Sequence, residues 1–202
     1  FPIGWVEDDG TRSLAIELGH LASDWRMLTP LADAQFVKVP QQISSWLFKF
    51  MVDVRRKSVL ELQDFLRNAP LNLEGSIQQT SQLAGLELKY GLEANGMRRM
   101  YRLRRLNVDN VESASALVLT FLVVTEQLPN MEIHLDVVSP GTSVILQDEK
   151  NSEHILTIDP TEVPGLPATM EFKPLSNSES QRFIGSRVGD LVIIEGAFNK
   201  HH

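Results

Sequence analysis

The 202-residue sequence contains no cysteine. This absence excludes disulfides, thiolate nucleophiles and cysteine-based zinc or iron–sulfur sites. The sequence also has no Asn-x-Ser/Thr glycosylation sequon. Together these two absences favour an intracellular protein of the cytoplasm or an organelle matrix, while an extracellular location stays open as the alternative.

Long hydrophobic runs are absent as well. The longest, Ala116–Val124, has nine residues, far fewer than the roughly 18 to 20 that a membrane-spanning helix needs. We therefore predict no membrane span. The chain begins at Phe1 rather than Met, which indicates a trimmed or a mature form, and we interpret His201 and His202 as a purification-tag remnant.

Motifs of the common enzyme classes are missing. The sequence contains no phosphate-binding loop, dinucleotide-binding glycine motif, serine-hydrolase G-x-S-x-G or zinc-protease H-E-x-x-H. We therefore predict no cofactor and no catalytic residues, and favour a protein that is not an enzyme.

The composition is that of an average globular protein, with 43% hydrophobic and 22% charged residues. At 22.7 kDa, folding is expected to bury roughly 70% of the extended-chain surface, enough for a core without a metal or a disulfide. We predict a single globular domain over residues 1–200.

Charge is distributed unevenly along the chain. Residues 1–40 carry a net charge of −3, residues 41–110 of +4 and residues 111–202 of −8, which together give the total of −7. A basic middle between acidic ends predicts a charge-segregated surface and a salt-sensitive association with a partner or with other copies of the chain.

The middle of the chain carries local structural signals. Alternating apolar residues over 46–55 predict a buried strand. Ser58 and Glu61 have the spacing of a capping box, which predicts a helix over 58–68. For residues 86–106 we predict a hairpin that turns at Ala94-Asn95-Gly96, with a long helix as the alternative.

The C-terminal part favours β-structure. Residues 116–124 form either a central strand or a short core helix, and periodicity does not separate the two. Five further strands are predicted, at 132–138, 143–147, 154–159, 170–173 and 191–195. The predicted fold class is therefore α+β, a β-rich and mostly antiparallel sandwich or partly open barrel with one or two packed helices.

An arginine cluster is the first candidate site. Five arginines fall within eight residues, beside two tyrosines and a lysine that could share their surface. Guanidinium groups bind phosphate or carboxylate, and tyrosine rings stack on bases, so the cluster could hold single-stranded RNA or an acidic protein. The candidate residues are Lys89, Tyr90, Arg98, Arg99, Tyr101, Arg102, Arg104 and Arg105.

A second, weaker candidate is the row Glu132, His134 and Asp136. On a strand these side chains would stand on one face about 7 Å apart, where they could hold a metal or act as acid and base. The alternative is the ordinary polar face of a half-buried strand. We therefore predict no metal site here and keep the row only as a candidate.

Three functions follow, in order of preference. The first is a non-enzymatic interaction module, such as an assembly factor, accessory subunit or structural component, which binds a protein partner or forms a homo-oligomer through its charge-segregated surface. The second is a protein that binds RNA or another polyanion through the arginine cluster, ranked lower because the whole chain is acidic. The third is a small metal-dependent or acid–base enzyme centred on His134.

Overall fold

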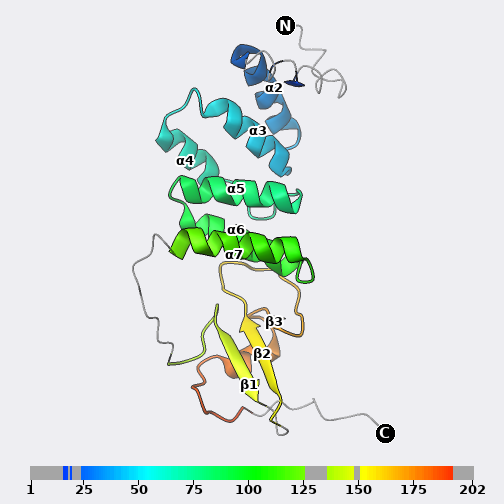
Figure 1. Ribbon diagram of the computed structural model, residues 1–202, viewed down its shortest axis with the longest axis vertical. Helices are drawn as coiled ribbons and strands as arrows, with labels where there is room; N and C mark the ends of the chain where they lie inside the picture. The colour runs from blue at the N-terminus through cyan, green and yellow to red at the C-terminus, as the bar shows by residue number, and fades with distance from the viewer. Residues whose placement is uncertain (1–15, 18, 20–23, 126–135, 148–150, 193–202) are drawn as a thin grey trace, which may run out of the picture. The chain divides into compact units, whose positions relative to one another are not determined.

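The computed structural model describes residues 16–17, 19, 24–125, 136–147 and 151–192. Of these described residues, 53% are helical, and they include one small three-stranded sheet (Figure 1). The prediction of a β-rich sandwich or barrel is therefore wrong. The chain divides into two compact units, which are described separately. A division into two compact units does not show whether they fold as one domain or as two. The single globular domain over residues 1–200 therefore remains a prediction.

The helical unit comprises Phe1–Arg104 and Asp109–Glu126. Helix α3 packs on α2 and α5, and α5 also packs on α4 and α7. In Figure 1, α5, α6 and α7 run across the view one below another. The helices are α2 (Trp25–Lys38), α3 (Ile43–Asp53), α4 (Val59–Arg67), α5 (Ile77–Lys89), α6 (Glu93–Leu106) and α7 (Val111–Thr125).

Helix α3 occupies the segment for which we predicted a strand, so that prediction is wrong. The apparent alternation consists of two interleaved helical stripes. These are Ile43, Trp46 and Phe50, which pack in a cluster with α4 and α5, and Phe48 and Val52, which pack against α2. A helix enclosed on two sides has a broad apolar surface, which imitates a period of two over a short stretch. The expected burial is nevertheless confirmed, since Phe48 and Phe50 are 8% and 5% exposed.

Helix α4 confirms the prediction of a capped helix. The Ser58 backbone N–H donates to Glu61 Oε2 at 2.9 Å, and the Glu61 N–H donates to Ser58 Oγ at 3.3 Å, which completes the capping box. Leu62 and Leu66 then face the cluster that contains Trp46 of α3. The helix therefore packs beside the preceding segment, as expected.

Residues 86–106 form neither the predicted hairpin nor one continuous helix. Helix α5 ends at Lys89 with Tyr90 as its C-cap, and the next residue, Gly91, has a φ of 72° in the left-handed region. The Leu92 N–H then donates to Glu87 O, and the Gly91 N–H to Leu88 O, the pattern of a Schellman cap. Gly96, the predicted turn residue, lies inside α6, where a Cβ would come within 3.0 Å of the Ala84 carbonyl oxygen of α5. This glycine allows two helices to approach closely instead of making a turn.

The sheet unit comprises Arg105–Val108 and Gln127–His202. Its β1 (Ser143–Gln147) and β2 (Glu153–Ile158) pair antiparallel, and β2 pairs parallel with β3 (Phe172–Lys173). The predicted strands at 143–147 and 154–159 are confirmed, and the one at 170–173 is confirmed for its last two residues. One face of β2 packs on α8 (Ser178–Phe183) through Phe183.

Two other predicted strands fall partly outside the described residues. Of 132–138, only residues 136–138 are described, and of 191–195 only 191–192, and neither remnant is a strand. Over the part of the chain that the structure describes, no helix combines the length and the apolar character needed to cross a membrane.

Candidate functional site

The predicted arginine cluster lies on α6, and the structure directs its side chains to different partners. Arg98 is half-buried; its Nε donates to the Ala94 carbonyl oxygen at 3.0 Å and its Nη2 to Asn95 Oδ1 at 2.6 Å. Both partners lie in the same helix. The Arg98 side chain therefore forms hydrogen bonds to the first turn of α6.

Arg99 is buried in the helical unit, with 1% of its surface exposed. Its Nε donates to both carboxylate oxygens of Glu87, at 3.1 and 3.0 Å, and its Nη2 donates to Oε1 at 2.7 Å. The remaining donors reach the carbonyl oxygens of Ala69 at 3.1 Å and Pro70 at 2.8 Å. The guanidinium thus joins α6, α5 and the segment after α4, and we call this group the Glu87–Arg99 clamp. Burial raises the pKa of Glu87, and Arg99 offsets that effect only in part.

Arg105 belongs to the sheet unit and is also buried. Its Nε and Nη2 donate to the two carboxylate oxygens of Asp159 at 2.7 and 2.9 Å, and Nη2 donates to the Pro167 carbonyl oxygen at 2.7 Å. The guanidinium carbon also lies 4.7 Å from the Phe172 ring centroid. This is a bidentate structural pair with a cation–π contact.

The other candidates of the cluster are not gathered into one open surface. Tyr101, Arg102 and Arg104 are half-buried, and each has interaction partners of its own. The Tyr90 ring makes an edge contact with Phe50, at 5.3 Å between centroids, so it packs against the core. Lys89 is exposed at the end of α5. The structure therefore pairs Arg99 and Arg105 with internal carboxylates, and binding of a polyanion by the remaining candidates stays a prediction.

The structure does not test whether Glu132, His134 and Asp136 lie together. Glu132 and His134 lie outside the described residues, and Asp136 lies in a bend. Among the side chains that the structure does describe, no three His, Asp or Glu residues gather closely enough to hold a metal ion.

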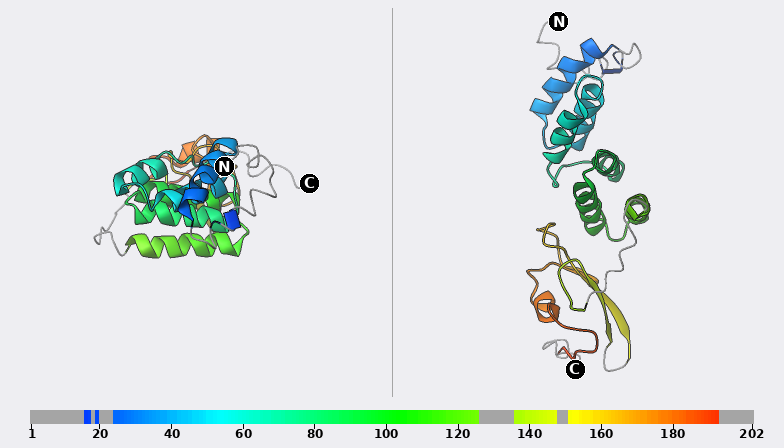
Figure 2. Two further views of the ribbon diagram at one scale, coloured as in Figure 1. Left: turned by 90° about the horizontal axis from the view of Figure 1, so that it is seen from above. Right: turned by 90° about the vertical axis from the view of Figure 1, so that its left-hand side faces the viewer.

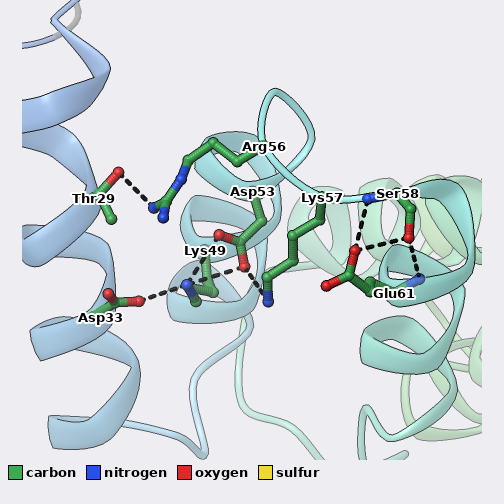
Figure 3. A network of polar contacts seen from close by, with 8 residues as sticks. All are labelled: Thr29, Asp33, Lys49, Asp53, Arg56, Lys57, Ser58 and Glu61. Atoms are coloured by element: carbon green, nitrogen blue, oxygen red, sulfur yellow. Dashed lines mark hydrogen bonds and ion pairs between the residues drawn. The ribbon is translucent and has the colours of Figure 1, made fainter.

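A polar network links α2, α3 and the turn before α4 (Figure 3). The Lys49 ammonium lies between two carboxylates, 2.5 Å from Asp33 and 3.0 Å from Asp53. Lys57 Nζ reaches the same Asp53 Oδ2 at 3.0 Å. Nearby, Arg56 Nη1 donates to the Thr29 hydroxyl at 2.9 Å. Asp33 is therefore paired with Lys49, and Asp53 is paired with both Lys49 and Lys57.

The acidic and basic groups of this network stabilise one another in their ionised forms. Burial alone would raise the pKa of Asp53, but the hydrogen bonds and positive charges of Lys49 and Lys57 outweigh it and hold that pKa below 3.8. Burial alone would likewise lower the pKa of Lys49, but Asp33 and Asp53 outweigh it and hold that pKa above 10.5. Both partners stay ionised at neutral pH, which is the behaviour of a structural ion pair.

An open groove of about 370 Å³ lies between α2, α3 and α5. Its lining side chains are either apolar or carry amide and hydroxyl groups, and none of these lining residues is an acid or a base. The lining residues are Ile16, Gln35, Ser44, Leu47, Phe48, Met51, Gln79 and Gln82. The groove offers shape and hydrogen bonds but no group for proton transfer.

Helix α7 has one packed side and one exposed apolar side, and the exposed side was not predicted from the sequence. Asn110 begins the helix, since its Oδ1 accepts from the N–H groups of Glu112 at 2.8 Å and Ser113 at 3.2 Å. The segment 116–124 is thus helical, one of the two alternatives that the sequence left open. Ala116 and Leu117 pack on a cluster formed by α5 and α6.

The opposite side of α7 is mainly apolar and faces solvent. Val111, Val118, Leu119 and Leu122 are 79, 57, 63 and 57% exposed, and the small Ser115 between them is also exposed. Their spacing of i, i+4, i+7, i+8 and i+11 forms one continuous helical stripe. We call this stripe the α7 face; it consists of Val111, Ser115, Val118, Leu119 and Leu122, with the half-exposed Phe121 at its flank.

The α7 face has a size and composition that distinguish it from scattered surface residues. Four of its five residues are large apolar side chains that are more than half exposed, and contiguous exposed apolar patches are often functional. No charged residue occurs from Ser113 to Thr125. The right panel of Figure 2 shows α7 end-on at the side of its neighbouring helices. The signal in the sequence is this lack of charge over more than three helical turns, whereas the continuous apolar run 116–124 predicted a buried segment.

A scan against protein-family models, a search of curated proteins and a search of solved structures each found no match. The functional argument therefore depends on the residues themselves.

Proposed function

We propose that this chain is a non-enzymatic protein-interaction module, an assembly factor, accessory subunit or structural component, that binds polypeptide through the α7 face. The carrying observation is the exposed stripe of Val111, Val118, Leu119 and Leu122, interrupted only by the small Ser115, on a helix whose other side is packed. A helix that is apolar around most of its circumference is normally covered on all sides. Large exposed apolar patches on otherwise polar proteins mark protein interfaces.

The proposal places the interface on a neutral surface instead of a charge-segregated one. Arg99 and Arg105 are buried against carboxylates, which weakens the support for the polyanion-binding alternative. Buried Asp53 and Glu87 are likewise paired with cations, so neither is available as a proton-transfer group. The enzyme centred on His134 gains no support, because that residue lies outside the described part of the chain.

The test is a capture experiment from the native source with three tagged baits. The baits are the unaltered chain, the double variant Val118→Glu/Leu119→Glu, and the control Leu60→Glu, whose residue on α4 is 72% exposed. Because glutamate in an apolar interface must be desolvated, we expect one or more polypeptides, including copies of the chain itself, to bind the first and third baits in near-stoichiometric amounts but not the second. Equal recovery on all three baits would contradict the proposal.

A further inference from the structure

The dipeptide Asn95-Gly96 in α6 has a chemistry of its own, and it occurs once in the sequence. In the deamidation of asparagine, the backbone nitrogen of the following residue attacks the side-chain carbonyl carbon, and a glycine in that place has no Cβ to hinder the approach. The contact of α6 with α5 requires glycine at position 96, because a Cβ there would lie 3.0 Å from the Ala84 carbonyl oxygen. The packing of two helices therefore keeps a reactive pair in the chain.

The folded chain holds this pair closed. Asn95 is half-buried and Gly96 is buried near the start of α6. The Gly96 N–H donates to the Leu92 carbonyl oxygen at 3.1 Å, so the nitrogen that would attack is held in the helical hydrogen-bond pattern. Asn95 Oδ1 accepts from Arg98 Nη2 at 2.6 Å, which holds the asparagine side chain toward the next turn of the helix.

Deamidation needs the first turn of α6 to open. Hydroxide removes the Gly96 N–H proton, the nitrogen bonds to the side-chain carbonyl carbon of Asn95, and the bond from that carbon to the amide nitrogen breaks, so that ammonia leaves. The product is a five-membered succinimide ring, which forces ψ of Asn95 away from the helical value of about −42°. The hydrogen bond from Gly96 to Leu92 and the close contact with Ala84 must therefore be given up before the ring can close.

The two products differ in what they do to the helix. Water opens the ring at either of its carbonyls, which gives aspartate or isoaspartate. Aspartate restores the original main chain and places a carboxylate in the first turn of α6, where it suits the helix dipole and lies within reach of Arg98. Isoaspartate adds a methylene to the main chain directly before Gly96, so α6 loses its helical register at the point where it lies closest to α5.

We infer that Asn95-Gly96 is a deamidation site that the packing of α6 on α5 keeps closed and that local opening of the start of α6 exposes. Helix ends open at a lower free energy than a whole domain unfolds, so the site responds to α6 rather than to global unfolding. Formation of isoaspartate converts such an opening into a permanent loss of the contact between α5 and α6. The reaction needs only hydroxide and water, so the site is independent of the proposed function.

Peptide mapping by mass spectrometry, after incubation of the purified full chain in mildly alkaline buffer, tests the closed state. The internal reference is Asn151-Ser152, because Asn151 is exposed and lies outside any helix or strand. In guanidinium chloride Asn95 should deamidate faster than Asn151. In the folded chain the rate at Asn95 should fall by at least about 10-fold, and by more than the rate at Asn151 does, because only the opened fraction of α6 reacts.

Two variants test whether the opening is local. Ala94→Gly leaves the reactive pair unchanged but weakens the first turn of α6 at an exposed position, so it should speed deamidation at Asn95 by about 5-fold in the folded chain and leave the rate in guanidinium chloride unchanged. Ser58→Ala is the matched control, because it destabilises the start of α4 instead. It should change the rate at Asn95 by less than about 2-fold.

Thermal melts of the two products test the consequence. The chain with isoaspartate at position 95, separated by chromatography after incubation in guanidinium chloride and refolding, should melt about 4 °C or more below the unaltered chain. Asn95→Asp supplies the other product and should melt within about 2 °C of it.

Three results would overturn the inference. They are a rate at Asn95 that differs by less than about 10-fold between the folded and the unfolded chain, an equal acceleration by Ala94→Gly and Ser58→Ala, and an isoaspartate chain that melts together with the Asn95→Asp chain.

Discussion

The Glu87–Arg99 clamp gives the sharpest prediction about stability. Both side chains are buried, and the guanidinium holds the carboxylate and two backbone carbonyls at once. Glu87→Gln leaves a permanently charged guanidinium without its counter-ion, which we expect to cost about 3–5 kcal/mol. This would be a large part of the roughly 5–15 kcal/mol typical of a whole domain.

The reverse substitution has a different pH dependence. Arg99→Met leaves a buried carboxylate whose pKa lies further above its usual value, and this carboxylate can take up a proton whereas a guanidinium cannot lose one. The proton binds more tightly to the folded than to the unfolded state, so the stability of Arg99→Met should rise as pH falls from about 8 to about 5. The deficit caused by Glu87→Gln should grow as pH falls, because the raised pKa of Glu87 lets the unaltered chain gain stability from proton uptake while the variant cannot. Glu87→Leu/Arg99→Met removes both charges and should cost less than the sum of the single variants by about 2 kcal/mol.

Urea denaturation of the full chain measures these effects as shifts of the midpoint at constant slope. Arg98→Met is the control for loss of an arginine from α6, because the hydrogen bonds of the half-buried Arg98 lie within α6 and its charge makes the smallest contribution to the pKa of Glu87; it should cost no more than about 1 kcal/mol. A loss below about 1 kcal/mol for Glu87→Gln, or no pH dependence for Arg99→Met, would refute the reasoning.

Three further predictions concern single positions. Because the pKa of Asp53 is held below 3.8, its stabilisation is present above that pH and is lost as pH falls through the lowered value; Asp53→Asn should therefore flatten acid denaturation curves, and an unchanged acid midpoint would argue against the network. Gly96→Ala should destabilise by about 1–3 kcal/mol because its Cβ would press on the Ala84 carbonyl, whereas Gly85→Ala, with open space around it, should stabilise α5 by up to about 1 kcal/mol; thermal melts in which both changes have the same sign would contradict this. Ser58→Ala removes a capping box and should cost about 1 kcal/mol by urea denaturation, and a cost near zero would show that packing alone holds α4.

Some features of the fold are determined by residues close together in the sequence. The capping box of Ser58 and Glu61 needs only four consecutive positions, so the start of α4 could be predicted without knowing its neighbours. The hairpin of β1 and β2 was predictable for the same reason, since both strands and their polar connection lie within 16 residues. The two absences that matter most for chemistry, cysteine and the common catalytic motifs, are also properties of the sequence alone.

Other features depended on contacts between distant segments. Residues 46–55 alternate as a strand would, and only the presence of α2 on one side and of α4 and α5 on the other explains why a helix buries both stripes. Gly96 has the sequence context of a turn, but the close approach of α5 places it inside a helix. Local pattern could not separate these alternatives, because apolar residues in a short run satisfy both periods.

The candidate functional residues also divide into features that the sequence determines and features that depend on tertiary contacts. The sequence determined that five arginines fall within eight residues and that 13 residues of α7, from Ser113 to Thr125, carry no charge. The tertiary structure decided that Arg99 and Arg105 reach buried carboxylates 12 and 54 positions away, and that one side of α7 faces solvent. A sequence states which side chains exist, but burial and pairing depend on what the rest of the chain brings against them. Here two arginines of the predicted binding surface, Arg99 and Arg105, are buried, and one side of the predicted core segment is exposed.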